Sequence, residues 1–316
     1  MTVSPARAHF GSLDVRVVAE PAYVGLLPVH FRVAAGPDEA APPDVELAIV
    51  DVETAQPRVE GLDDELRVDR SGDEERITTS ITELVIDRDA KPVRARLAVA
   101  ASGQDPGFVA HYVAMNVRLL LRRLGRLQLH GAAATIHGRT VVLLGDKGAG
   151  KSTLSVAIGR AGGTVLGDDQ LMLHVGDAVT ISGVDGGLRL TAQTERHFFA
   201  VPLAYEAQDF AGTLKKEVPL GDFVEAAPGT EAVPTACYFP RVGDRFEVIP
   251  IGRPVAVARL LEALVPLHRF TGPTDQLAFV RAITTFFGAV DVFDLTLSPD
   301  LHELDRVVAT LAGDPT

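Results

Sequence analysis

The sequence predicts an α/β protein in which a β-rich part is followed by a part where strands and helices alternate. Up to about residue 106, short segments rich in Val, Ile and Thr are separated by turn-forming Gly, Pro and Asp. From Leu127 onward, apolar strands precede segments with the three- and four-residue apolar spacing of helices. We therefore expect two domains, residues 1–106 and residues 107–316.

The N-terminal domain is expected to be a small antiparallel β-rich module. Its β-branched residues favour the pleated, half-buried surface of a sheet. The predicted strands are Leu13–Ala19, Val29–Val33, Val45–Val50, Ile77–Ile86 and Val93–Val99. This part of the sequence holds no cluster of His or Cys, so we expect no reaction to take place in it.

A helix is expected to open the second domain. Asp105 suits the N-cap and Pro106 the first helical position, and apolar residues then recur at helical spacing to about Arg123. The elements expected after it are strands at Leu127–Ala134, Thr140–Leu144, Thr164–Leu166, Gly187–Thr191, Thr235–Phe239 and Phe246–Pro250, and helices ending at about Ala161 and covering Val255–Leu264, Thr274–Phe287 and Pro299–Leu311.

Charge and cysteine content exclude several classes of function. The net charge of −12 over 316 residues disfavours general nucleic-acid binding, which needs a basic surface. A single cysteine, Cys237, excludes an intramolecular disulfide and a cysteine-based zinc cluster, and its apolar neighbours place it in the core. No window approaches the roughly 18 apolar residues of a membrane span. We expect a cytoplasmic protein without nucleic-acid or membrane partners; a homo-oligomer remains open.

A phosphate-binding loop (Walker A motif) is the strongest signal in the sequence. Residues 145–152 match G-x-x-x-x-G-K-[ST] between an apolar strand and a helix, the context that this motif requires. Lys151 is expected to reach the β and γ phosphates of a nucleoside triphosphate, and the Ser152 hydroxyl to bind Mg²⁺. The residues expected to bind nucleotide are Gly145, Asp146, Lys147, Gly148, Ala149, Gly150, Lys151, Ser152 and Thr153.

An acid pair follows the loop after one helix and one short strand. This order should return Asp168 and Asp169 to the side of the loop, where a carboxylate can hold Mg²⁺ or accept a proton from an attacking hydroxyl. A solvated turn is the alternative for such a pair. No LSGGQ-like signature and no N-K-x-D motif accompanies the loop, which argues against an ABC ATPase and a small GTPase.

These motifs together carry a family resemblance. Leu129–Ala133, Val141–Thr153 and Val165–Asp169 resemble the catalytic domain of HPr kinase/phosphorylase and its relatives near peptide-modification clusters. The resemblance implies a fold similar to phosphoenolpyruvate carboxykinase, with a mixed sheet, and phosphate transfer to a serine hydroxyl. It also implies that Asp168 is the general base, that Asp169 and Ser152 hold Mg²⁺, and that His130 lies near the nucleotide.

Other basic residues are candidate phosphate contacts. Arg189 alternates with apolar residues on a predicted strand and so faces away from them. Lys215 and Lys216 form the one double lysine of a lysine-poor chain, and Arg253 lies in a segment that loosely resembles the family's proline-glycine-arginine segment. Solvated surface positions are the alternative for all four. For His130 the alternative is a hydrogen-bonded core histidine.

The leading hypothesis is an ATP- and Mg²⁺-dependent kinase that phosphorylates a hydroxyl, with a peptide or protein serine as acceptor. Asp168, Asp169, His130 and Lys151 are its candidate catalytic residues. Two alternatives use the same loop: a nucleotide-sensing regulator with slow or absent hydrolysis, and a small-molecule hydroxyl kinase. The sequence does not name the acceptor, and neighbouring carboxylates cannot be separated by sequence alone.

Overall fold

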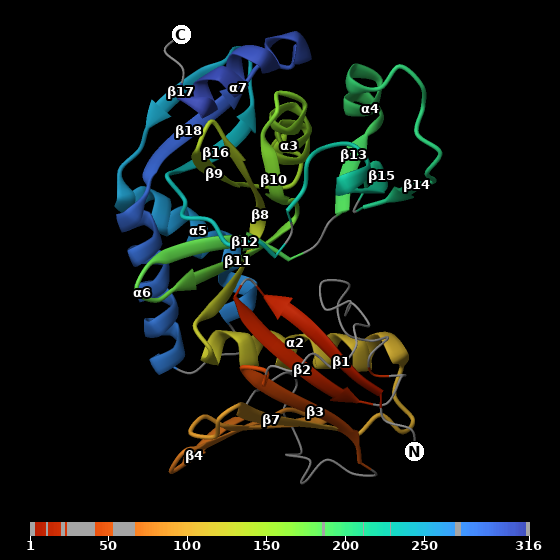
Figure 1. The fold of residues 1–316 in the computed structure, drawn as a ribbon, viewed down its shortest axis with the longest axis vertical. Helices are drawn as coiled ribbons and strands as arrows, with labels where there is room; N and C mark the ends of the chain where they lie inside the picture. Colours follow the sequence, from red (N-terminus) through yellow and green to blue (C-terminus); the bar gives the residue numbers. More distant parts are fainter. Residues whose placement is uncertain are drawn as a thin grey trace. The chain divides into compact units, whose positions relative to one another are not determined.

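The computed structural model describes residues 4–10, 12–19, 23, 42–52, 67–184, 187–210, 212–227, 229–268 and 273–313. It is an α/β fold with mixed sheets, so the predicted α/β class with a mixed sheet is confirmed (Figure 1). The chain divides into two compact units. One is Met1–Arg126 with Leu267–Gln276, and the other is Leu127–Pro266 with Leu277–Thr316.

The first unit contains a seven-stranded sheet in the order β1-β2-β3-β7-β6-β5-β4. Its strands are β1 (Ser4–Phe10), β2 (Leu13–Ala19), β3 (Val45–Asp51), β4 (Arg67–Ser71), β5 (Glu74–Thr78), β6 (Thr82–Asp87) and β7 (Val93–Val99). The sheet is mixed, because β3 lies parallel to both β2 and β7. The expectation of an antiparallel sheet was therefore wrong at these two pairings, which join strands that are distant in sequence.

One predicted strand of this unit is in fact two. The segment 77–86 is divided between β5 and β6 by a turn in which Thr79 N donates to Thr82 O at 2.8 Å. The two threonine hydroxyls are also hydrogen-bonded, at 2.6 Å. Threonine has high strand propensity, so composition concealed the turn. The predicted strand Val29–Val33 lies outside the described residues.

Helix α2 (Pro106–Arg123) belongs to the first unit. Its N-cap is Asp105, as predicted, whose carboxylate accepts from Gly107 N and Phe108 N. The buried Asn116 side chain of α2 donates to Thr82 Oγ1 of β6 at 2.8 Å. The helix thus packs on the sheet. The units separate after Arg126, whereas the sequence analysis placed the domain boundary before this helix.

The second unit is built on a sheet in the order β12-β11-β8-β9-β16-β18-β17, with β10 beside β8. Strand β16 lies parallel to both β9 and β18, and β8 is antiparallel to β9. The strands are β8 (Arg126–Ile136), β9 (Arg139–Leu144), β10 (Thr164–Gly167), β11 (Gln170–Val175), β12 (Val179–Gly183), β16 (Ala236–Val242), β17 (Glu247–Pro250) and β18 (Asp291–Leu297).

Helices cover both faces of this sheet. Helices α3 (Lys151–Arg160) and α7 (Leu304–Ala312) bury apolar residues in one core with Leu143, Tyr238 and Leu295. Side chains alternate along a strand, so Phe239 faces the other side, where its ring stacks on Phe287 of α6 (Pro273–Ala289). Helix α5 (Arg253–His268) lies on that side as well, since its Arg259 guanidinium sits over the Phe239 ring.

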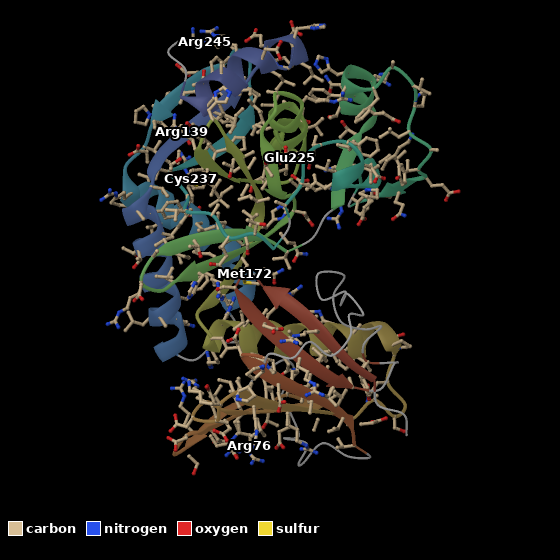
Figure 2. All side chains as sticks on the ribbon, viewed as in Figure 1. Arg76, Arg139, Met172, Glu225, Cys237 and Arg245 are labelled. Carbon is tan, nitrogen blue, oxygen red and sulfur yellow. The ribbon has the colours of Figure 1, made fainter. Side chains whose placement is uncertain are left out.

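A smaller sheet, β13 (Gly187–Thr191), β15 (Leu214–Pro219) and β14 (Ala207–Asp209), completes the second unit with α4 (Ala192–Phe198). Short 3₁₀ turns lie at Leu220–Asp222 and Leu301–Glu303. Cys237 is fully buried, as predicted, within the packed side chains of this unit (Figure 2). No helix in the described residues has the length and apolarity needed to cross a bilayer.

Candidate phosphate-transfer site

The loop of residues 145–150 joins the buried strand β9 to helix α3. Gly148 and Gly150 have φ of +82° and +95°, which side chains with a Cβ rarely adopt. At Gly150 a Cβ would also lie 2.7 Å from a methyl carbon of Leu297. These glycines let the backbone curl at the start of α3, where N–H groups and the helix dipole favour an anion.

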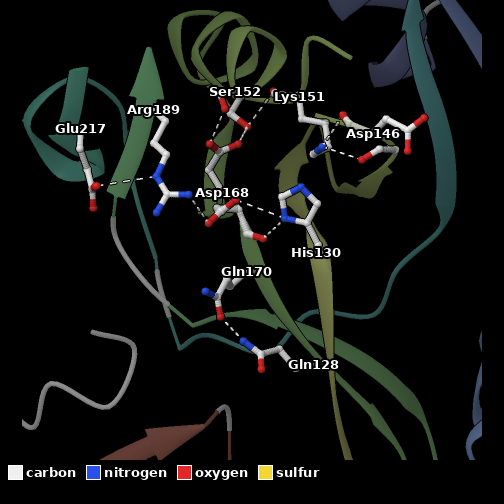
Figure 3. A network of polar contacts seen from close by, with 12 residues as sticks. Gln128, His130, Asp146, Lys151, Ser152, Asp168, Gln170, Arg189 and Glu217 are labelled. Carbon is white, nitrogen blue, oxygen red and sulfur yellow. Dashed lines mark hydrogen bonds and ion pairs between the residues drawn. The ribbon is translucent and has the colours of Figure 1, made fainter. Parts of the chain in front are cut away.

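Lys151 is buried at the first turn of α3 and folds back over the loop (Figure 3). Its Nζ donates to the carbonyl oxygens of Gly145 at 2.7 Å and Asp146 at 3.0 Å. Burial lowers the pKa of Lys151, against the pull of Asp168 and Asp169. The ammonium is therefore held among carbonyl oxygens, which an incoming phosphate could replace as its partners.

Asp168 lies against the first turns of α3. The Ser152 hydroxyl donates to its Oδ2 at 2.6 Å, and the Ser155 hydroxyl donates to its Oδ1 at 3.0 Å. The residue is 1% exposed, so the acid pair is not a solvated turn. Ser155 was not singled out in the sequence. Its place one helical turn after Lys151 is the signal that could have indicated it.

Asp169 points to a different set of partners because the chain bends sharply at it. Its φ is +75°, a left-handed conformation that Asp tolerates better than most residues. One carboxylate oxygen lies 3.2 Å from His130 Nδ1 and the other accepts from Arg189 at 2.8 Å. Strands β10 and β11 both lie beside β8, and the register of β10 on β8 shifts between Val165 and Gly167, directly before the two aspartates (Figure 3).

The environments of the acid pair move their pKa values in opposite directions. Burial raises the pKa of Asp168 to about 6, although the two serine hydroxyls oppose this. Burial also acts to raise the pKa of Asp169, but the His130 hydrogen bond and the Arg189 charge outweigh it and hold the pKa below its ordinary value. Such a separation is typical of paired carboxylates that have different chemical roles.

His130 is half exposed at the loop side of β8, so it is not a core histidine. Its Nδ1 lies 2.9 Å from the backbone oxygen of Asp169. A carbonyl oxygen can only accept, so Nδ1 carries the proton in the neutral ring and Nε2 is the acceptor nitrogen. Among the described residues, Nε2 has no hydrogen-bond partner.

The remaining candidates divide into two groups. Arg189 is at the site, because its guanidinium binds Asp169 and lies over the Phe210 ring. Lys215 is also close: burial and then the charge of Lys147 lower its pKa, and Asp168 and Asp169 act on it in the opposite direction. Lys216 is not directed to the site, since its ammonium donates to the Glu195 carboxylate and to the backbone oxygen of Leu203. Arg253 is an exposed residue at the start of α5. Thr153, the last of the predicted nucleotide-binding residues, forms a hydrogen bond between its hydroxyl and that of Thr194.

The donor set beside the loop suits Mg²⁺. The Ser152 hydroxyl and the Asp168 carboxylate are hard oxygen ligands within hydrogen-bond distance of each other. Mg²⁺ in phosphate-transfer sites is held by one or two protein oxygens together with the substrate's phosphates. Within the described ranges there is no group of three or more His, Cys, Asp or Glu residues that could hold a metal on its own.

A cavity of about 720 Å³ adjoins the first half of the loop. His130, Gly145, Asp146 and Lys147 line its loop end. The opposite wall comes from β16, β18 and α5. The cavity belongs entirely to the second unit.

Comparisons with known proteins found a likeness in solved structures but none in sequence. No protein-family profile matches the sequence, and no curated protein matches it significantly. The structure is similar to the HPr(Ser) kinase/phosphatase from Coxiella burnetii with a TM-score of 0.32 and 11% identity, over 59% of this chain and 94% of that one. This distant likeness assigns no role to any residue.

Proposed function

We propose that this chain is an ATP- and Mg²⁺-dependent phosphotransferase that acts on a hydroxyl group, with a serine of a peptide or protein as the acceptor. The observation that carries the proposal is the hydrogen bond between Ser152 at the loop and the buried Asp168. It joins the two oxygen ligands of a metal–triphosphate site. Beside them stands a separate group, Asp169 with His130 and Arg189, which can act on an acceptor.

The loop amides and the Lys151 ammonium bind the triphosphate, with the α and β phosphates at the start of α3. Ser152 and Asp168 would hold Mg²⁺, which neutralises phosphate charge when bound. This gives Asp168 the metal-binding role that the family resemblance assigned to Asp169, and the role of base passes from Asp168 to His130, which Asp169 orients. Asp168 is enclosed by two serine hydroxyls, whereas Asp169 and His130 reach the open side.

In the proposed reaction, the acceptor hydroxyl oxygen attacks the γ-phosphorus and the bond from that phosphorus to the β–γ bridging oxygen breaks. The acceptor becomes a phosphate ester and ADP leaves. The hydroxyl proton passes to His130 Nε2, the ring nitrogen that has no partner in the described structure. Asp169 orients the ring through Nδ1 and stabilises its charged form. Arg189, held by Asp169 at Nη1 and by Glu217 at Nε, offers its Nη2 group to the transferring phosphoryl oxygens.

The test measures transfer of labelled γ-phosphate to a library of synthetic peptides, each with one serine. Loss of a general base costs roughly 10²–10⁴-fold in rate. We expect that loss in both His130→Ala and Asp169→Asn, with the double variant no worse than either, since the two residues act as one unit. The exposed histidine variant His302→Gln is the matched control.

The outcomes separate the parts of the proposal. Asp168→Asn should differ in kind, with weaker apparent Mg²⁺ affinity and partial recovery at high Mg²⁺. If His130→Ala keeps its rate while Asp169→Asn loses it, Asp169 takes the proton directly. Nucleotide binding with no acceptor-dependent transfer to any peptide or small hydroxyl compound would contradict the kinase function and favour a nucleotide-sensing regulator.

A further inference from the structure

The cavity beside the loop adjoins both the phosphate-binding loop and the proposed proton acceptor. Its lining includes Gly145, Asp146 and Lys147 of the loop but no residue of α3. His130, the proposed proton acceptor, lines it as well. Lys151 Nζ bonds the carbonyl oxygens of Gly145 and Asp146, two residues that line the cavity, so a γ-phosphate bound by this ammonium would lie at the loop end of the cavity.

The far wall of the cavity does not suit a nucleobase. Phe239 is the one aromatic ring among the described lining residues apart from the His130 imidazole, and it is 9% exposed. Its ring stacks on Phe287 and lies under the Arg259 guanidinium. This covered ring therefore offers a purine no open aromatic face on which to stack.

Arg259 and Asp294 form a fixed, neutral pair on that wall. Both terminal nitrogens of Arg259 donate to the carboxylate of Asp294, one to each oxygen. This is the bidentate geometry that arginine and a carboxylate prefer. The charge of Arg259 is thus balanced by that of Asp294. Recognition of a charged ligand therefore depends on other residues of the cavity.

Arg241 is the charged group that is placed for a ligand. Its Nε donates to the hydroxyl of Thr296, its register partner on β18, at 3.2 Å. Within the described structure its two terminal NH₂ groups have no partner, and the side chain lines the cavity. A guanidinium anchored at Nε presents the fork that binds a carboxylate.

The preference for an anion is local to Arg241. The lining carries the cations Lys147, Arg241 and Arg259 and the acids Asp146, Glu262 and Asp294, so it has no general excess of positive charge. A polyanion would meet these acids. A single carboxylate on the acceptor could bind Arg241 without close contact with all of these acids.

We infer that this cavity is the acceptor site, and that the acceptor carries a carboxylate close to the hydroxyl that is phosphorylated. The inference rests on the proposed function and names the substrate class for it. Arg241 binds the carboxylate, and this contact orients the hydroxyl toward His130 and the γ-phosphorus. The carboxylate can belong to the same residue as the hydroxyl or to the side chain of its neighbour.

Three probes distinguish these sources. N-acetylserine carries an α-carboxylate, N-acetylserinamide carries none, and N-acetyl-Asp-Ser-amide carries a side-chain carboxylate. Binding is measured by saturation-transfer NMR with a non-hydrolysable ATP analogue and Mg²⁺, and phosphate transfer is measured separately with ATP. The variants are Arg241→Gln and, as control, Arg245→Gln. Arg245 is 81% exposed and lies 3.7 Å from Glu247 in the segment that joins β16 to β17 (Figure 2).

We expect one of the carboxylate probes to bind more tightly than N-acetylserinamide by about 10- to 100-fold, the range of a hydrogen bond to a charged group. The preferred probe identifies the source of the carboxylate. Arg241→Gln should abolish the preference, and Arg245→Gln should keep it. Equal binding of all probes, no binding of either carboxylate probe at millimolar concentration, or an unchanged preference in Arg241→Gln would overturn the inference.

Failure of the kinase function is distinguishable from failure of this inference. Arg241-dependent binding of a carboxylate probe without transfer from ATP would leave the inference standing and contradict the kinase. Equal transfer to neutral and acidic probes would support the kinase and overturn the inference.

Discussion

Replacement of Asp168 by asparagine should make the metal-free protein more stable at pH 8, although it removes a proposed Mg²⁺ ligand. Burial raises the pKa of Asp168 from an ordinary value of 3.8 to about 6. Each pKa unit corresponds to about 1.4 kcal/mol, so the ionised carboxylate costs the folded state about 3 kcal/mol at pH 8. Asparagine carries no charge to bury.

The variant also loses part of the carboxylate's hydrogen bonding. Ser152 and Ser155 both donate to Asp168, and one of them must instead accept from the asparagine NH₂. A hydrogen bond of this kind contributes about 1 kcal/mol. The expected net gain in the free energy of unfolding is therefore about 2 kcal/mol at pH 8.

The sign reverses the usual behaviour of an aspartate. Because the folded pKa lies above the unfolded one, the folded state holds more protons between about pH 4 and pH 6, and the wild type loses stability as the pH rises through this window. At pH 5 the cost of the charge is about 1.5 kcal/mol, so the advantage of Asp168→Asn should shrink to less than about 1 kcal/mol.

The assay is urea unfolding at pH 5 and pH 8 in a chelating buffer, followed by hydrogen exchange in α3. Exchange in α3 reports on the second unit alone, since the two units need not unfold together. Asp177→Asn, at an exposed position between β11 and β12, is the matched control and should change little. A destabilised Asp168→Asn at pH 8, or a gain that is independent of pH, would show that burial does not raise this pKa.

Three further predictions follow from the site and the first unit. Lys151→Ala should abolish phosphate transfer and weaken ATP binding, measured by calorimetry; unchanged transfer in a folded variant would contradict the assignment of the loop. Gly150→Ala should lower ATP affinity because its φ is +95° and its Cβ would meet Leu297, and an unchanged affinity would show that the loop tolerates another path. Glu75→Gln should destabilise the first unit by about 3–5 kcal/mol, because the buried Glu75 balances Arg123. Burial acts to raise the pKa of Glu75, but Arg123 and Arg88 hold it below 4.5, so the wild-type advantage should be present above that pH and decline as pH falls, measured by hydrogen exchange in β5.

Local sequence was sufficient for most elements and for the loop. The N-cap at Asp105, helix α3 and the strands at β7 and β9 depend on contacts between residues near one another in the chain, which composition and spacing express directly. The motif also fixes which residues face a phosphate, because Gly148 and Gly150 are needed wherever the backbone must adopt positive φ.

Elements whose partners are distant in sequence were harder to predict. Strand β18 begins Asp-Val-Phe-Asp, and aspartate has low strand propensity. The segment nevertheless lies between β16 and β17 in the sheet. The parallel pairing of β3 with β7 could not be predicted from the sequence either, because no local sequence feature distinguishes a parallel pairing from an antiparallel one. Whether these segments form strands, and with which partners, depends on packing against distant residues more than on the strand propensity of their own residues.

At the site, the sequence determined that two carboxylates return to the phosphate loop, and the tertiary structure decided what each can do. Asp168 and Asp169 are chemically identical and adjacent. The left-handed turn at Asp169 directs one carboxylate to Ser152 and Ser155 and the other to His130 and Arg189, which come from different strands. Their pKa values separate because burial and the charges of distant residues differ between two positions that the chain places side by side.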